Sequence, residues 1–257
     1  MTPIHELLSL KGKTAIVTGG AVNIGRATTL RLAEAGANVA VIYYHSQKEA
    51  YDLSGMLKKS GYKHFIFKAD LTKENEVKNA TKKVIEHFGG VDVLVNNAGI
   101  FGLSMQENLK TEDWESVFDI NVKGIFMLSR EIIGVMKKNK NGGVIVNMAS
   151  INGVHPGFGK TAHYDATKGA VIAYTKSLAA ELAKNNIRVN AVAPGLVDSK
   201  NLRKFAPELA EMVEKRTPLQ KLAIHEDIAN AVLYLSTKAS SHITGEILIV
   251  DGGYLLT

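Results

Sequence analysis

Three residue types that can act together on a carbonyl group lie between positions 150 and 168. Tyr164 follows Ser150 by fourteen residues, and Lys168 follows Tyr164 by four, about one turn of an α-helix. Reduction of a ketone by hydride transfer puts negative charge on the carbonyl oxygen, which then needs hydrogen-bond donors and a proton. Tyr44 with Lys48 and Tyr234 with Lys238 share the Tyr–Lys spacing, and we expect these to be neighbour pairs on a helix. The strand-end serine distinguishes Tyr164 with Lys168 and predicts a carbonyl site, with Tyr164 as proton donor and Ser150 as a neutral second donor.

The elements expected around these residues would bring them together. The run Gly-Gly-Val-Ile-Val-Asn-Met-Ala before Ser150 is typical of a buried strand, and residues 162–184 are typical of a long apolar helix. An ammonium beside a phenol favours the phenolate, so we expect Lys168 to lower the pKa of Tyr164 from its free value near ~10. Ser150 is not expected to be an acyl-enzyme nucleophile, because no Gly-x-Ser-x-Gly turn surrounds it.

Short runs rich in β-branched residues alternate with helical patterns along the whole chain. This alternation predicts an α/β, doubly wound parallel sheet, a Rossmann fold, in a single domain over residues 1–257, because no linker or repeat interrupts it. The irregular stretch from Pro194 to Pro218 is where a substrate lid would lie, at the carboxyl edge of the sheet. The expected strands are residues 14–18, 39–43, 64–68, 91–95, 144–148, 188–192 and 247–250.

Composition and charge narrow the class of protein. The chain has no cysteine, which excludes disulfides and thiolate sites, and its histidines lack ligand spacing, so we expect no metal. No apolar run is long enough to cross a membrane and no signal-peptide pattern begins the chain, which predicts a soluble, cytoplasmic protein with no membrane partner. The formal net charge of +6 is dispersed, so no nucleic-acid partner is expected.

Glycines and small polar residues follow three of the expected strands. Gly19 and Gly25 bound a turn between the first strand and a helix, where backbone N–H groups can meet a pyrophosphate. Asp70 and Leu71 close the third strand and could meet an adenine edge, while residues 96–99 close the fourth, where small residues let the backbone approach a ribose. Each set also has a turn-forming alternative. Together they outline a dinucleotide groove.

In combination and in order, these residues resemble the motifs of the short-chain dehydrogenase/reductase family over nearly the whole chain. The resemblance implies a seven-stranded parallel sheet flanked by helices and a homotetramer, with a dimer as second choice. It also implies that Lys168 hydrogen-bonds the nicotinamide ribose and that Asn121 supports a water relaying protons to Lys168. The matching pieces are Thr18 and Gly19 with Gly25, Asp70, Asn96, Asn97, Ala98, Gly99, Asn121, Ser150, Tyr164 with Lys168, Pro194, Gly195, Asp251, Gly252 and Gly253.

Two positions depart from the family pattern. Asn23 replaces the middle glycine of the first turn, and Asn tolerates a left-handed backbone better than other residues with a Cβ. Ser199 stands where the family often has Thr, and its hydroxyl could still reach a nicotinamide carboxamide. The expected catalytic residues are Ser150, Asn121, Tyr164 and Lys168. The expected cofactor-binding residues are Gly19, Asn23, Ile24, Gly25, Tyr44, His45, Ser46, Asp70, Leu71, Asn97, Ala98, Gly99, Tyr164, Lys168, Pro194, Gly195, Val197 and Ser199.

The end of the second strand bears on the choice of cofactor. No acid occurs between Tyr43 and Lys48, so the carboxylate that typically binds the ribose hydroxyls in NAD sites, and repels a 2′-phosphate, is missing. His45 and Ser46 could donate to a phosphate, and a helix beginning near Ser46 would add favourable partial charge. Against this, no Arg is present there, and Val22 stands where NADP-linked relatives often carry a basic residue. We expect NADP(H) to be preferred, with NAD(H) still possible.

Three functions fit these residues. The first is an NADPH-dependent reductase of a ketone or 3-oxoacyl substrate. The second is an NAD-dependent dehydrogenase of a sugar, sugar acid or polyol, which the context of residues 8–13 suggests by resemblance. The third, a catalytically silent dinucleotide sensor, is least expected because the catalytic set is intact. The partner is therefore a small-molecule carbonyl or alcohol, and its shape is expected to be read by residues 153–161 and 196–218.

Overall fold

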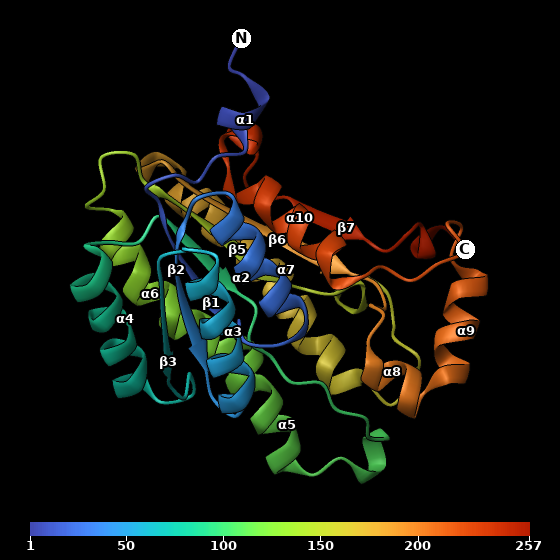
Figure 1. The fold of residues 1–257 in the computed structure, drawn as a ribbon. Helices are drawn as coiled ribbons and strands as arrows, with labels where there is room; N and C mark the ends of the chain where they lie inside the picture. Colours follow the sequence, from blue (N-terminus) through green and yellow to red (C-terminus); the bar gives the residue numbers. More distant parts are fainter.

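Seven parallel strands form the centre of the computed structural model, which describes residues 1–257 (Figure 1). Their order across the sheet is β3-β2-β1-β4-β5-β6-β7. The winding reverses between β1 and β4, and parallel sheets bind ligands at such a switch point. The doubly wound parallel fold expected from the sequence is confirmed. The strands are β1 (Thr14–Thr18), β2 (Asn38–Tyr43), β3 (His64–Lys68), β4 (Val93–Asn96), β5 (Gly143–Met148), β6 (Ile187–Pro194) and β7 (Ile247–Val250).

Helices cover both faces of this sheet, which explains why the central strands are largely apolar, with buried Asn96, Asn147 and Asn190 as polar exceptions. Ile16 of β1 packs in one core cluster, while its neighbours Ala15 and Val17 pack in the other. Strands buried on both faces show no apolar-polar alternation. One face packs against α4 (Glu74–Phe88), α6 (Gly124–Met136) and α7 (Ala162–Leu182), and the other against α2 (Asn23–Glu34), α3 (Gln47–Lys59) and α10 (His225–Ser236).

The segment between β6 and α10 differs from the irregular stretch that we expected. It contains α8 (Lys200–Phe205) and α9 (Pro207–Arg216), which lie beyond the carboxyl ends of the strands (Figure 1). The Ser199 hydroxyl accepts a hydrogen bond from the N–H of Leu202 and so caps α8, while Pro207 begins α9. Both are helix-start signals that the sequence interpretation missed.

The helical region after residue 110 is divided in two. A π-helical turn over Asp119–Lys123 separates α5 (Thr111–Phe118) from α6. Such turns widen a helix locally and are frequent at functional sites. The remaining short helices are α1 (Ile4–Leu7) and the 3-10 turns Gln106–Asn108, Ile151–Gly153, Ala183–Asn185, Lys238–Ser240 and Tyr254–Leu256. None of the helices combines the length and apolar character needed to cross a bilayer.

Candidate active site

Ser150, Tyr164 and Lys168 line one cavity of about 370 Å³ at the carboxyl ends of the strands. Ser150 follows β5, while Tyr164 and Lys168 lie in the first two turns of α7. The Ser150 hydroxyl accepts a hydrogen bond from the N–H of Asn152 at 3.2 Å, which holds its oxygen while leaving its proton free to donate. The packing of α7 against β6 and the turn after Ser150 therefore brings together three groups that lie up to eighteen residues apart.

Lys168 is almost fully buried, and its ammonium is fixed by the backbone of β5. Its Nζ donates a hydrogen bond to the carbonyl oxygen of Met148 at 2.8 Å. No carboxylate pairs with it, and burial lowers the pKa of Lys168 to about 8. The amine is therefore poised to change charge within the range where many enzymes work.

Tyr164 is less acidic in this structure than we expected. Burial raises the pKa of Tyr164 to about 12, the Ser150 hydroxyl opposes this shift, and the charge of Asp165 adds to it. The Nζ of Lys168 lies 5.5 Å from the centre of the phenol ring, over its face rather than against its oxygen. The expected lowering of this pKa by Lys168 is therefore wrong for this arrangement, because burial raises the pKa and the ammonium does not lower it.

Asn121 lies behind the cavity, in the π-helical turn, and is fully buried. Its Oδ1 accepts from the N–H of Ile100 at 2.8 Å, and its Nδ2 donates to the carbonyl oxygen of Ile100 at 3.0 Å and to Thr167 Oγ1 at 3.1 Å. These bonds join the segment after β4 to α7 beside Lys168. The water relay implied for Asn121 stays a prediction.

The turn between β1 and α2 has the backbone that a close ligand requires. Asn23 adopts φ 49°, the left-handed conformation expected for it. Gly25 packs so closely that an added Cβ would overlap the carbonyl oxygen of Gly19 and lie 2.6 Å from Asn97 Nδ2. A backbone turn with glycine at positions 19 and 25, at the N-terminus of α2, lets N–H groups approach a pyrophosphate, so these residues fit the dinucleotide.

Thr18 joins the two strands that border the switch point. Its Oγ1 accepts from the N–H groups of Asn97 at 3.0 Å and Ala98 at 2.9 Å, and Asn97 Nδ2 donates to the Thr18 carbonyl oxygen at 2.9 Å. Gly19 and Gly25 line the cavity from one side and Asn97 to Gly99 from the other. The groove expected at successive strand ends is therefore formed.

A second cavity of about 580 Å³ continues this groove toward β2 and β3, and shares Gly19, Ala98 and Gly99 with the first. Asp70 lines it, although its Oδ1 also accepts from the N–H and hydroxyl of Thr72, the turn-forming role that we considered. Ser46 begins α3 without a side-chain capping bond, so its hydroxyl has no partner there. The expected residues lining this part are Tyr44, His45, Ser46, Asp70 and Leu71.

Most of the expected cofactor residues line one of these two cavities, and the structure adds others. Ser199 does not line either cavity, since its hydroxyl caps α8. Phe101 was missed, yet its ring packs edge-on against Tyr164 with centroids 4.9 Å apart. Phe101 belongs to no motif. The one signal for its place in the site was the apolar pair Ile100 and Phe101 after Gly99, which is exposed in the structure. Residues Ile24, Pro194, Gly195 and Val197 lie in the first cavity as expected.

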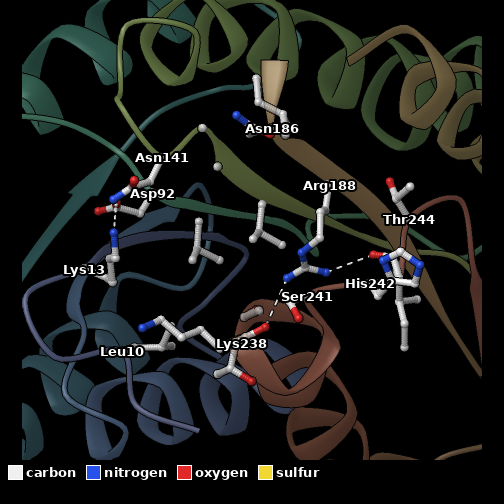
Figure 2. A pocket seen from close by; sticks show the side chains of 18 of the residues that line it. Leu10, Lys13, Asp92, Asn141, Asn186, Arg188, Lys238, Ser241, His242 and Thr244 are labelled. Atoms are coloured by element: carbon white, nitrogen blue, oxygen red, sulfur yellow. Dashed lines mark hydrogen bonds and ion pairs between the residues drawn. The ribbon is translucent and has the colours of Figure 1, made fainter. Parts of the chain in front are cut away.

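A third cavity, of about 990 Å³ and larger than these two, lies at the opposite edge of the sheet, where the strands begin (Figure 2). Lys13 pairs there with Asp92 at 2.8 Å, and the guanidinium of Arg188 donates to the carbonyl oxygens of Leu235 and Ile243. These charged groups form hydrogen bonds within the fold. No pair comparable to Tyr164 and Lys168 lines this cavity.

Known proteins resemble this chain over nearly its full length. The family model described as enoyl-(acyl carrier protein) reductase matches residues 19–255. The 3-oxoacyl-[acyl-carrier-protein] reductases FabG of Staphylococcus epidermidis and Thermotoga maritima are 39% and 36% identical to it. Those alignments cover 94% and 97% of this chain, and 98% and 100% of the two relatives.

Solved structures agree with these sequence matches. The crystal structure of gox2181 superimposes with a TM-score of 0.93 at 35% identity, covering 98% of this chain and 99% of that one. A short-chain type dehydrogenase/reductase from Mycobacterium marinum has a TM-score of 0.91 at 32% identity, covering 99% and 100%. The similarity thus includes every strand, the glycine turn and the Tyr164 helix, and the chain belongs to the short-chain dehydrogenase/reductase family of oxidoreductases.

Proposed function

We propose that this protein is an NADPH-dependent reductase that converts a 3-oxoacyl substrate, or a ketone of similar shape, into the secondary alcohol. The observation that carries the proposal is the single cavity in which Ser150, Tyr164 and Lys168 face the glycine turn after β1. The activity named for the FabG relatives supports the 3-oxoacyl substrate. We also propose that residues 1–257 form one domain and that the protein acts in the cytoplasm.

The residues of the cavity have separate roles in this proposal. Bound NADPH would supply the hydride. Ser150 donates a hydrogen bond to the substrate oxygen, and Tyr164 donates a second bond and then its proton as negative charge develops there. Lys168 orients the nicotinamide ribose with its ammonium. Asn121 holds the segment around Ile100 and contributes to proton supply behind Lys168.

A substrate panel tests this function. We expect NADPH oxidation with a 3-oxoacyl thioester, followed at the nicotinamide absorbance, and much slower reaction with sugars, sugar acids and polyols in the presence of NAD. Catalytic efficiency on the sugar arm above that on the thioester arm would contradict the proposal and favour a sugar or polyol dehydrogenase. No turnover on either arm, with cofactor bound, would favour a dinucleotide sensor.

The preference for NADPH has its own prediction. Ser46 at the start of α3 and His45 border the adenosine end of the groove, and the ammonium of Lys68 lies 5.2 Å from the Tyr44 ring centre. These groups favour a 2′-phosphate, so kcat/KM should be higher with NADPH than with NADH. Ser46→Asp should lower the NADPH value and spare the NADH value, because a carboxylate repels the phosphate. An NADH preference above about tenfold, ~1.4 kcal/mol, in the wild type would refute this assignment.

The segment from Pro194 to Pro218 is proposed as a substrate lid. Its helix α8 buries no residue, and Phe205 is 73% exposed. Arg203 ties α8 to Asp198 and Glu214 through two bidentate pairs on the surface. Because no residue of α8 is buried, hydrogen exchange over residues 200–205 should still be faster in the free protein than in the buried helices, and should slow once cofactor and substrate bind. Strong protection of the whole segment without ligand would show a rigid pocket instead.

A homotetramer is proposed, with a dimer as the second choice. Two separate apolar surfaces support it. Trp114 and Phe126 are partly exposed along α5 and α6, and Ile249 is 43% exposed on the edge strand β7, near the apolar end of the chain. Two self-complementary contacts on different faces generate a closed tetramer. Light scattering at micromolar concentration should give four chains, and a monomer would refute both contacts.

A further inference from the structure

Asp165, the residue after Tyr164, is hydrogen-bonded to three residues of the loop that precedes α7. Its carboxylate accepts hydrogen bonds from Asn152 Nδ2 at 2.7 Å, from the Gly157 N–H at 3.0 Å and from Thr161 Oγ1 at 2.9 Å. These three donors span residues 152–161, hereafter the 152–161 loop, which connects Ser150 to the helix of Tyr164. One side chain thus ties the start, the middle and the end of this loop to the first turn of α7.

The bonding pattern favours a carboxylate. The Gly157 N–H can only donate, and an ionised carboxyl group accepts at both oxygens, so all three partners can donate to it at once. An amide in its place would remove the charge and would satisfy all three only after Asn152 or Thr161 turned to accept. Gly157 packs between the same side chains, since an added Cβ there would lie 2.5 Å from Thr161 Oγ1. The loop is therefore shaped around the charge and size of this one group.

The 152–161 loop is in a position to border the substrate. The carbonyl oxygen of Lys160 accepts a hydrogen bond from the N–H of Ser104 at 2.8 Å, which joins the loop to the segment whose Phe101 ring packs on Tyr164. The loop also carries Phe158, half exposed, with its ring 6.2 Å from that of Tyr254. We propose that Asp165 is a positioning residue that holds the 152–161 loop in its substrate-binding shape.

The test compares Asp165→Asn with Glu181→Gln, which removes an exposed carboxylate at the far end of the same helix. We expect Asp165→Asn to raise the KM of the carbonyl substrate about tenfold, the loss of one hydrogen bond to a charged group, with cofactor affinity unchanged. The kcat should change little, because Ser150, Tyr164 and Lys168 are all retained. Thr161→Val, which removes one of the three donors, should raise KM less. An unchanged KM in Asp165→Asn would overturn the proposal.

The KM measurement rests on the proposed function, because it needs the substrate. Hydrogen exchange does not, and so it tests the positioning role separately. Without any substrate, Asp165→Asn should speed exchange over residues 153–160 and Glu181→Gln should not. This result stands whatever the enzyme reduces. Unchanged exchange in Asp165→Asn would refute the positioning role even if the substrate panel succeeds. If Asp165→Asn does not fold, KM and hydrogen exchange are measured in Thr161→Val instead. Wild-type values of both in that variant would count against the positioning role.

Discussion

Replacement of Tyr164 by Phe is expected to lower turnover by at least about 10² to 10⁴, the usual contribution of general acid catalysis. The change removes the phenol oxygen and leaves the ring, which packs against Phe101. The fold and the affinity for NADPH should therefore change little. Single-turnover reduction of the substrate, with NADPH binding measured by fluorescence titration, separates the two effects.

Tyr174→Phe is the matched control for this prediction, since it removes a phenol oxygen from the same helix at a position outside the cavity. It should keep wild-type turnover. If Tyr164→Phe retained more than about a tenth of the wild-type rate, Tyr164 would not be the proton donor, because so small a loss is below the range of acid catalysis.

Replacement of Lys168 by Ala should lower turnover and also weaken the cofactor, which distinguishes it from Tyr164→Phe. The variant removes a buried ammonium whose Nζ is held by the Met148 carbonyl oxygen at 2.8 Å. If this ammonium also binds the nicotinamide ribose, a lost hydrogen bond to a charged group should weaken NADPH binding roughly tenfold to a hundredfold. Fluorescence titration measures this directly. Equal NADPH affinity in the variant and the wild type would exclude the ribose contact.

The pH dependence gives a second check on Lys168. Burial lowers the pKa of Lys168 to about 8, so its positive charge is present below that pH and is lost above it. The wild-type rate of reduction should therefore fall as the pH rises through about 8, and this inflection should be missing in Lys168→Ala. Lys176→Ala, an exposed lysine on the same helix, should keep the wild-type profile. A wild-type inflection in Lys168→Ala would assign it to another group.

The order of elements and the identity of the reacting groups could be predicted from local patterns. Most strands are short runs rich in β-branched residues, and strands buried on both faces of a parallel sheet are mostly apolar along their length. The groove followed because parallel strands all end at the same edge, which places Gly19, Asp70 and Asn97 near one another. The helices α8 and α9 were missed because their cues, Ser199 and Pro207, are also common in loops.

What the sequence by itself determined was therefore the fold class and the set Ser150, Tyr164 and Lys168, since spacing and periodicity are local properties of the chain. Only the tertiary structure decided how these groups are tuned. Lys168 lies over the face of the Tyr164 ring, and desolvation raises the pKa of the phenol to about 12 instead of lowering it. The bonds of Asp165 to the 152–161 loop were equally invisible. Burial and contact distance depend on how elements remote in the sequence pack together, and no pattern of residue types along one segment specifies them.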